Sequence, residues 1–578
     1  MRRFVLSALV LAVSLGVCRV SPAQPASSGG MKTMAIASFS GYDQMLKAVE
    51  MLGKLGNNPM LPMMVDGGIK MNTGGQGLAG LDTKRPWGLI VQTDGQKFPA
   101  VGFIPVTDLK KLLAVFEPQI GKPKDDGKGV LEIKVKDQTV YVTEKGGWAL
   151  ISNSPEDLAA APQDPLKALD GLNESYDLAI RAMVKNIPPE LRQVAMAPLQ
   201  QIMGKSAEKL PNESDEQFAL RSKITKRSME QITNLLNDLD TFQLGIKLDE
   251  KSSTAFLEYQ ITAVPGTKTA QQMGQMKDQK SSFAGFLRPE AALAVNMASK
   301  LAEADLAQVK DTVSMARANA LKELEKQDLS EADLKQAKQM VGDLMDVIEK
   351  TLESGRIDGG MAVMLDAKLL TLVAGAYVAE TTKLDSLLRQ LVSQLTKENA
   401  EAAKMVKLDA ETHEEVKFHT VTLPTAMMGN VPPQVTELIG DNLEIVIGIG
   451  AQSVYLSAGR DAVKTLKQMI TASKTGADQT VPPARLSVAA IPISKAAAAL
   501  AEGKAKGIAA QIAKLLEQTP GKDHLTITST PIPNGGKVRI ELEPGLLKLI
   551  ASLPMRVMSA AGGMPPGLGA PAPGIEQK

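Results

Sequence analysis

The segment FPAVGFIPVTDLKKLLAVF (98–116) has a counterpart later in the chain, VAGAYVAETTKLDSLLRQL (373–391). Each begins with an apolar run typical of a β-strand and then shows apolar residues at i, i+3, i+4 and i+7. That spacing places them on one face of a helix: Leu109, Leu112, Leu113 and Phe116 in the first segment, and Leu384, Leu387, Leu388 and Leu391 in the second. Both segments therefore predict a strand followed by an amphipathic helix, with Thr107 and Thr382 placed to cap it.

The likeness continues downstream of both segments. Residues 129–161 predict three strands and then a helix that begins at Ser154-Pro155. Residues 416–423 and 443–469 predict the same order of elements. The second region is longer because of 396–411 and 424–442, which we expect to be inserted loops, since loops tolerate insertion at low cost.

A shorter element, a strand leading into a helix, occurs four times. Its copies are MAIASFSGYDQMLKAV (34–49), DLAIRAMVKNIPPEL (177–191), AALAVNMASKLAEAD (291–305) and RLSVAAIPISKAAAAL (485–500). Each is followed by a predicted hairpin, at 88–106, 242–262, 357–379 and 524–542. Two hairpins carry clear turn sequences, LDEKSST and PIPNGG.

These repeats predict two tandem related copies, 31–275 and 288–555, each built from β-α-β-β-α units. Strands followed by hairpins favour an α+β fold in which mixed, mostly antiparallel sheets are packed by helices. The second copy also predicts a long charged helical hairpin at 300–353, with Ser330 capping its second helix. A shorter helical region is expected at 190–237 in the first copy.

The N-terminus predicts export. Residues 1–23 have two arginines, a short apolar run and small residues before Gln24, which is the pattern of a cleaved signal peptide. A lipid anchor at Cys18 is the alternative, although Val17 is bulky for that position. Cleavage after Ala23 would remove the single cysteine, so the mature chain would hold no disulfide. The Gly- and Pro-rich tail, 556–578, is expected to be disordered.

Composition argues against several classes of function. Lys and Arg (65) balance Asp and Glu (64), and aromatic residues make up only 3% of the chain. Nucleic-acid binding needs a basic surface and often aromatic platforms, so we expect no nucleic-acid partner. GKPKDDGKG (121–129) lacks the spacing and the Ser or Thr of a phosphate-binding loop. We assign no catalytic, cofactor-binding or metal-binding residue, and expect no cofactor.

Two groups of residues allow both a structural and a metal-binding interpretation. His413, Glu415 and His419 would share one face of a strand, and these residue types can bind a metal ion. Their spacing fits no metal motif, so a half-exposed polar strand face is expected. Methionines cluster in residues 60–71, as Met60, Met63, Met64 and Met71. They can fill irregular gaps in the core, form an apolar contact surface, or bind Cu(I) through their thioethers.

Three functional hypotheses remain. The first is an exported, non-enzymatic binding or structural protein whose partner is a protein or an apolar ligand, with no transmembrane segment after signal cleavage. The second is a carrier of an apolar, lipid-like ligand, because the chain is rich in aliphatic residues and poor in aromatic ones. The third is a hydrolase that uses a carboxylate pair, since two carboxylates can meet from any positions in the sequence.

Overall fold

The computed structural model describes residues 30–560, apart from 136–137, 160, 163, 195–196, 198–200, 202–208, 210–212, 399 and 430. The predicted signal segment and Cys18 lie outside the described residues, as does the tail from residue 561. Helix α19 (Pro544–Ala560) includes the first residues of the predicted tail. The disorder of residues 556–578 stays a prediction.

Twenty strands form one sheet, and the strand pairs of the described chain are antiparallel. The first half of the chain supplies β1 (Lys32–Phe39), β2 (Trp87–Thr93), β3 (Ala100–Pro105), β4 (Lys124–Asp125), β5 (Val130–Val135), β6 (Gln138–Lys145), β7 (Trp148–Ser152), β8 (Leu178–Met183), β9 (Leu239–Asp249) and β10 (Thr254–Ala263). The second half supplies β11 (Leu293–Lys300), β12 (Arg356–Leu365), β13 (Leu370–Tyr377), β14 (Val406–His413), β15 (Val416–Pro424), β16 (Asn442–Ile449), β17 (Ser453–Gly459), β18 (Ala484–Ala489), β19 (His524–Ile532) and β20 (Gly535–Leu542).

The strand order is the same in the two halves. From one outer edge to the middle it runs β4-β5-β6-β7-β3-β2-β1-β8-β9-β10. From the other edge it runs β14-β15-β16-β17-β13-β12-β11-β18-β19-β20. The halves meet where β10 pairs with β20, so the sheets expected for two copies are one continuous sheet.

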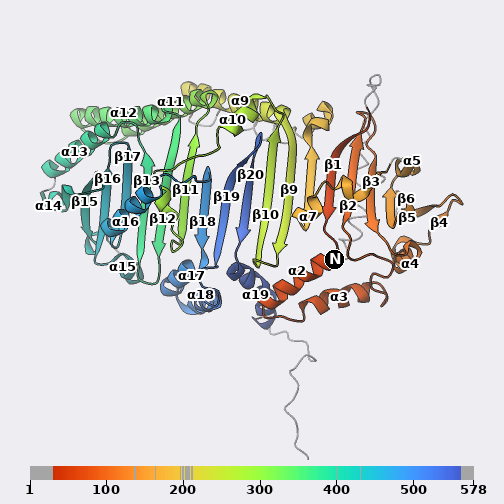
Figure 1. The fold of residues 1–578 in the computed structure, drawn as a ribbon. Coiled ribbons are helices and arrows are strands. Elements are labelled where there is room, and N and C mark those ends of the chain that lie inside the picture. Colours follow the sequence, from red (N-terminus) through yellow and green to blue (C-terminus); the bar gives the residue numbers. More distant parts are fainter. Residues whose placement is uncertain are drawn as a thin grey trace, which may run out of the picture.

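Helices accompany the strands in both halves. The first half contains α2 (Tyr42–Leu55), α3 (Leu61–Asn72), α4 (Leu109–Ile120), α5 (Pro155–Ala159), α6 (Pro165–Ala168), α7 (Leu172–Ser175), α9 (Asp215–Asp238) and α10 (Lys268–Gly274). The second contains α11 (Glu303–Leu324), α12 (Glu331–Glu353), α13 (Thr381–Glu398), α14 (Ala400–Lys404), α15 (Pro433–Ile439), α16 (Ala462–Thr475), α17 (Ala490–Leu500), α18 (Gly503–Leu516) and α19. Figure 1 shows α9 to α13 along one end of the strands and α2, α3, α15 and α17 to α19 along the opposite end.

The predicted α+β class is confirmed, and so are the four hairpins: β2–β3, β9–β10, β12–β13 and β19–β20. The charged helical hairpin is α11 and α12, and Ser330 Oγ accepts a hydrogen bond from the Asp333 amide. The expectation of loops at 396–411 and 424–442 is wrong, because these segments contain β14 with α14, and α15.

The predicted helix stripes are buried at their centres. Leu112 of α4 and Leu387 of α13 are each 7% exposed. At the end of its stripe, however, Leu391 is 52% exposed, so that part of the prediction is wrong. Asp108, and not Thr107, caps α4, and it accepts a hydrogen bond from the Lys111 amide.

In both halves, helices and adjoining segments cover the outer part of one face of the sheet, which we call the covered face. In the first half, Leu158, Leu169 and Leu172, from α5 to α7 and the residues between them, pack on strand residues such as Phe103. In the second half, α16 and the segment before β11 pack on Val373 and its neighbours. The core therefore consists of two apolar layers on the covered face, with a further layer under α2 and α4 on the opposite face.

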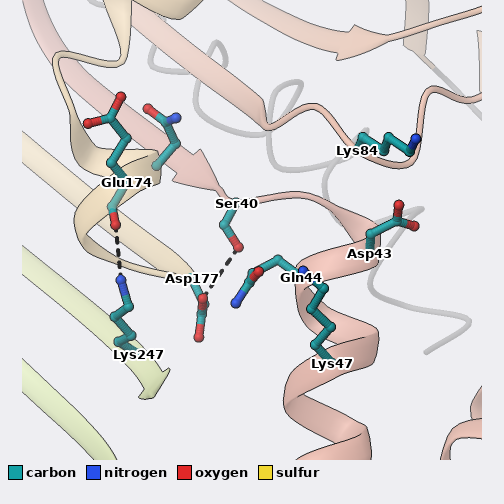
Figure 2. A pocket seen from close by; sticks show the side chains of 9 residues that line it. Ser40, Asp43, Gln44, Lys47, Lys84, Glu174, Asp177 and Lys247 are labelled. Carbon is teal, nitrogen blue, oxygen red and sulfur yellow. Dashed lines mark hydrogen bonds between the residues drawn. The ribbon is translucent and has the colours of Figure 1, made fainter. Parts of the chain in front are cut away.

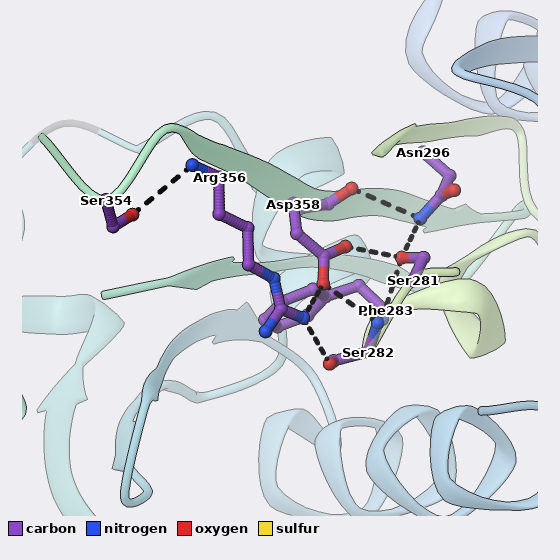
Figure 3. A network of polar contacts seen from close by, with 8 residues as sticks. Ser281, Ser282, Phe283, Asn296, Ser354, Arg356 and Asp358 are labelled. Carbon is purple, nitrogen blue, oxygen red and sulfur yellow. Dashed lines mark hydrogen bonds and ion pairs between the residues drawn. The ribbon is translucent and has the colours of Figure 1, made fainter. Parts of the chain in front are cut away.

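The segment that links the halves is held in the second of these layers. Phe283 is fully buried, and its amide donates to Ser281 Oγ. Asp358 of β12 accepts hydrogen bonds from Ser281 Oγ (2.6 Å) and the Ser282 amide (2.9 Å), and it pairs with Arg356 (Figure 3). Because a buried carboxylate is stable only when it is paired, this network fixes the path of the link.

Candidate functional site

The face of the sheet opposite the covered face is apolar across the middle of the molecule. Directly paired residues of antiparallel strands point to the same face. One such row follows the registers through eight strands: Leu178, Ile246, Leu257, Ile540, Ile527, Leu486, Val295 and Met361. Neighbouring residues on the same face are also largely apolar, among them Ile180, Leu244, Phe242, Tyr259, Val538 and Met297. We call this surface the apolar face.

The residues of the apolar face are accessible. All eight in the row are exposed or half-buried, and Ile180 beside them is 49% exposed. Eight strands at about 4.8 Å spacing make a row about 34 Å long. With strands about 20 Å long, the projected area is about 700 Å². Isolated apolar patches on soluble proteins are usually a few hundred Å², and larger ones mark interaction sites.

The covered face is polar over the same strands. At the centre of the sheet Glu258 of β10 lies opposite Arg539 of β20, and Thr528 of β19 and Arg485 of β18 follow in the same row. Glu258 is 2% exposed and also contacts Lys537 at 3.2 Å. The two faces of the central strands thus differ in polarity, and among the described residues no buried apolar cluster is built on the row from Leu178 to Met361.

Burial of the Glu258 carboxyl raises its pKa, but hydrogen bonds from Tyr176 and Arg539 and the charges of Lys537 and Arg539 outweigh that effect and lower the pKa to about 2. Tyr176 Oη donates to Glu258 at 2.6 Å and accepts from Gln243 and Gln260. The buried Glu258 carboxylate is therefore fully paired. We interpret this cluster as a structural link between the two halves and not as a reactive site.

A polar pocket of about 530 Å³ lies where β1 ends and α2 begins. Ser40, Lys84 and Lys247 line it together with Asp43, Glu174 and Asp177. Figure 2 shows the three carboxyl groups apart from one another, with Asp177 pointing away from Glu174 and Asp43. Burial raises the pKa of the Asp177 carboxyl, which accepts a hydrogen bond from the Leu248 amide. This pocket does not bring two carboxylates face to face, as the hydrolase hypothesis requires.

The histidine group does not form the expected strand face. Glu414 and Glu415 have positive φ and make the turn between β14 and β15, so His413 and His419 lie on different strands. His419 is buried and accepts a hydrogen bond from the Asp409 amide, and burial lowers its pKa. Within the described residues no group of three His, Cys, Asp or Glu side chains is placed to hold a metal ion.

The methionine cluster is exposed. Met60, Met63, Met64 and Met71 are 47, 61, 64 and 80% exposed, and α3 has no buried residue. The interpretation that these methionines fill the core is therefore wrong. None of the described helices combines the length and hydropathy that crossing a bilayer would require.

The apolar face was not predicted from the sequence. Alternating aliphatic residues in β9 and β10 show which side chains share a face, but they do not show whether another layer covers it. No protein-family model, curated protein or solved structure matches the chain. Among the described residues, the apolar face is the feature on which we base a function.

Proposed function

We propose that this protein is a non-enzymatic binding protein that carries an apolar, acyl-chain ligand along its apolar face. The observation that carries the proposal is the row from Leu178 to Met361, in which aliphatic side chains of eight paired strands remain accessible. Removing such side chains from water is favourable by about 25 cal/mol per Å². An apolar ligand that covered part of this face would therefore gain substantial binding energy.

The dimensions and composition of the face fit acyl chains. One leaflet of a bilayer, half of a hydrocarbon core of about 30 Å, is about 15 Å thick. An extended acyl chain of that length fits along strands that span about 20 Å. The side chains are mainly Leu, Ile, Val and Met, which adapt to flexible chains, and Tyr259 and Phe242 are the aromatic exceptions. Figure 1 shows helices at both ends of the strands, where they bound the sheet.

We further propose that the chain arose by internal duplication and is exported after cleavage at Ala23. The common strand order of the two halves and their pairing through β10 and β20 support the duplication. Residues 1–23 support export. A doubled sheet gives a wider face than one copy could, and this suits a ligand with more than one chain.

The proposal is tested by two adjacent residues of β19. Ile527 lies on the apolar face opposite Ile540, whereas Thr528 lies on the covered face opposite Arg539, and both are half-buried. Protein purified without detergent is extracted with organic solvent, and the extract is analysed by mass spectrometry. We expect acyl lipids with the wild type and Thr528→Asp, and a clear loss with Ile527→Asp.

A fatty-acid titration followed by fluorescence repeats the comparison with an added ligand. Wild type that carries no lipid and binds no fatty acid would contradict the proposal, as would equal binding by both variants. Light scattering tests the competing explanation. A stable dimer that Ile527→Asp dissociates would show that a second copy of the chain covers the face.

A further inference from the structure

Helices line both ends of the strands (Figure 1), and both sets contain ion pairs, Lys54–Glu50 of α2 among them. At one end, α11, α12 and α13 are joined by ion pairs such as Lys310–Glu353 (2.5 Å) and Lys383–Asp343 (2.9 Å). At the other end, α3, α2, α19, α18 and α17 follow one another (Figure 1). We call this second group the lysine–methionine edge, because α18 carries three lysines and α3 the exposed methionines.

On α3 the exposed methionines form a stripe. Met60, Met63, Met64 and Met71 follow helical spacing along one side of α3, and Gly67 between them has no atom near the position of a Cβ. This side of the helix points to solvent, so its apolar side chains contribute nothing to the core. A helix that displays its apolar side in this way is typical of one that rests on an apolar or interfacial surface.

Helices α18 and α19 of the same edge carry further exposed aliphatic residues, and α18 also carries lysines. Ile508 of α18 is 59% exposed, and Ile550 of α19 is exposed as well. Helix α18 has Lys504, Lys506 and Lys514 and no acidic residue, and among the described residues neither Lys504 nor Lys506 has an ion-pair partner. Lysines beside apolar side chains suit the headgroup region of an anionic bilayer, where the charge meets phosphate and the stem stays in the interface.

Close packing makes the edge continuous. A Cβ at Gly56, just after α2, would lie 2.8 Å from the Ala551 Cβ of α19, so these helices touch at this point. Helix α3 packs on α2, and α18 packs on α19. The helices that carry the apolar and positive residues are thus packed on one another, and they come from both halves of the chain.

We propose that the lysine–methionine edge docks on the surface of an anionic lipid bilayer, with the methionines of α3 and the aliphatic residues of α18 in the interface. The opposite edge, where ion pairs join α11, α12 and α13, then faces away from the membrane. This inference goes beyond ligand binding and does not depend on it, because the docking residues lie on helices outside the apolar face.

The test is sedimentation of the full chain with phosphatidylcholine vesicles that contain or lack phosphatidylglycerol. We expect binding that requires phosphatidylglycerol and weakens with salt. Each lysine neutralised near an anionic surface costs about fivefold in affinity, so Lys504→Gln with Lys506→Gln should lose about 25-fold. Met63→Gln with Met64→Gln should lose at least about tenfold, because two apolar side chains no longer enter the interface.

Matched controls come from the opposite edge. Leu391→Gln removes an apolar side chain of similar exposure from α13, and Lys335→Gln removes a charge from α12. Both should bind vesicles as the wild type does. Ile527→Asp should also keep vesicle binding, which separates this inference from the ligand proposal. Absence of vesicle binding by the wild type, or equal losses in control and edge variants, would overturn docking. So would a loss in Ile527→Asp alone, since the apolar face would then be the part that meets the bilayer.

Discussion

Glu258 and Arg539 face one another across the β10–β20 pair, with Arg539 Nε 2.8 Å from Glu258 Oε2, at the only sheet contact between the two halves in the described chain. The carboxylate comes from the first half and its two cationic partners, Arg539 and Lys537, from the second. Because a buried charge without its partner is costly, the pair ties correct folding of each half to the presence of the other.

The first prediction concerns acid stability. The folded pKa of Glu258, about 2, lies below its ordinary value of 4.5, so the unfolded state binds more protons between these values. The stabilisation is complete above about pH 5 and is lost as the pH falls toward 2. Its size at neutral pH is about 3 kcal/mol. Urea unfolding at several pH values should show a smaller acid-induced loss of stability for Glu258→Gln than for the wild type. Parallel pH profiles for the two proteins would contradict the assignment.

The second prediction uses two glycines at equivalent places. Gly88 of β2 and Gly360 of β12 both point to the covered face, and an added Cβ would lie 2.2 Å from Phe103 and 2.8 Å from Phe286, respectively. Gly88→Ala and Gly360→Ala should each cost about 1–3 kcal/mol of unfolding free energy, as overpacking does. Gly102→Ala is the control, because its nearest neighbour would be 3.8 Å away. A control as damaging as the other two would mean that backbone effects, and not close packing, limit these sites.

The third prediction concerns whether a core substitution destabilises mainly the half of the chain that contains it. Leu112→Asp and Leu387→Asp each place a charge in a buried site, at a cost of at least about 3 kcal/mol. Hydrogen exchange should show lost protection first in the half that holds the substitution. Leu391→Asp, at an exposed site of the same helix as Leu387, should change stability by less than about 0.5 kcal/mol. Two harmless core substitutions would refute the alignment of the helix stripes.

The fourth prediction follows from ligand linkage. A ligand that binds only the folded protein raises the melting temperature, and at 100 times its Kd it adds about 2.7 kcal/mol. Removing bound lipid should therefore lower the melting temperature, and added fatty acid should restore it in the wild type and in Thr528→Asp. Calorimetry of Ile527→Asp should show a smaller rise. An unchanged melting temperature in delipidated wild type would count against the apolar face as the binding surface.

Local patterns predicted local structure well. Helical spacing identified α4 and α13, and turn residues identified the β9–β10 and β19–β20 hairpins, because these signals arise from neighbours in the sequence. The β10–β20 pair joins strands far apart in the chain and leaves no such signal, so the single sheet was missed. The turn at Glu414 and Glu415 was missed as well, because neither residue is a common turn former.

The strands at the two outer edges of the sheet limit the addition of further strands from other chains. At one margin β4 is two residues long, and at the other the β14–β15 ladder is interrupted between Lys407 and Glu411. Neither margin offers a long, regular row of free amides and carbonyls on which a further chain could add. A sheet this wide, with an aliphatic surface across its middle, would otherwise be prone to fibrillar growth, and its blunted margins oppose such growth.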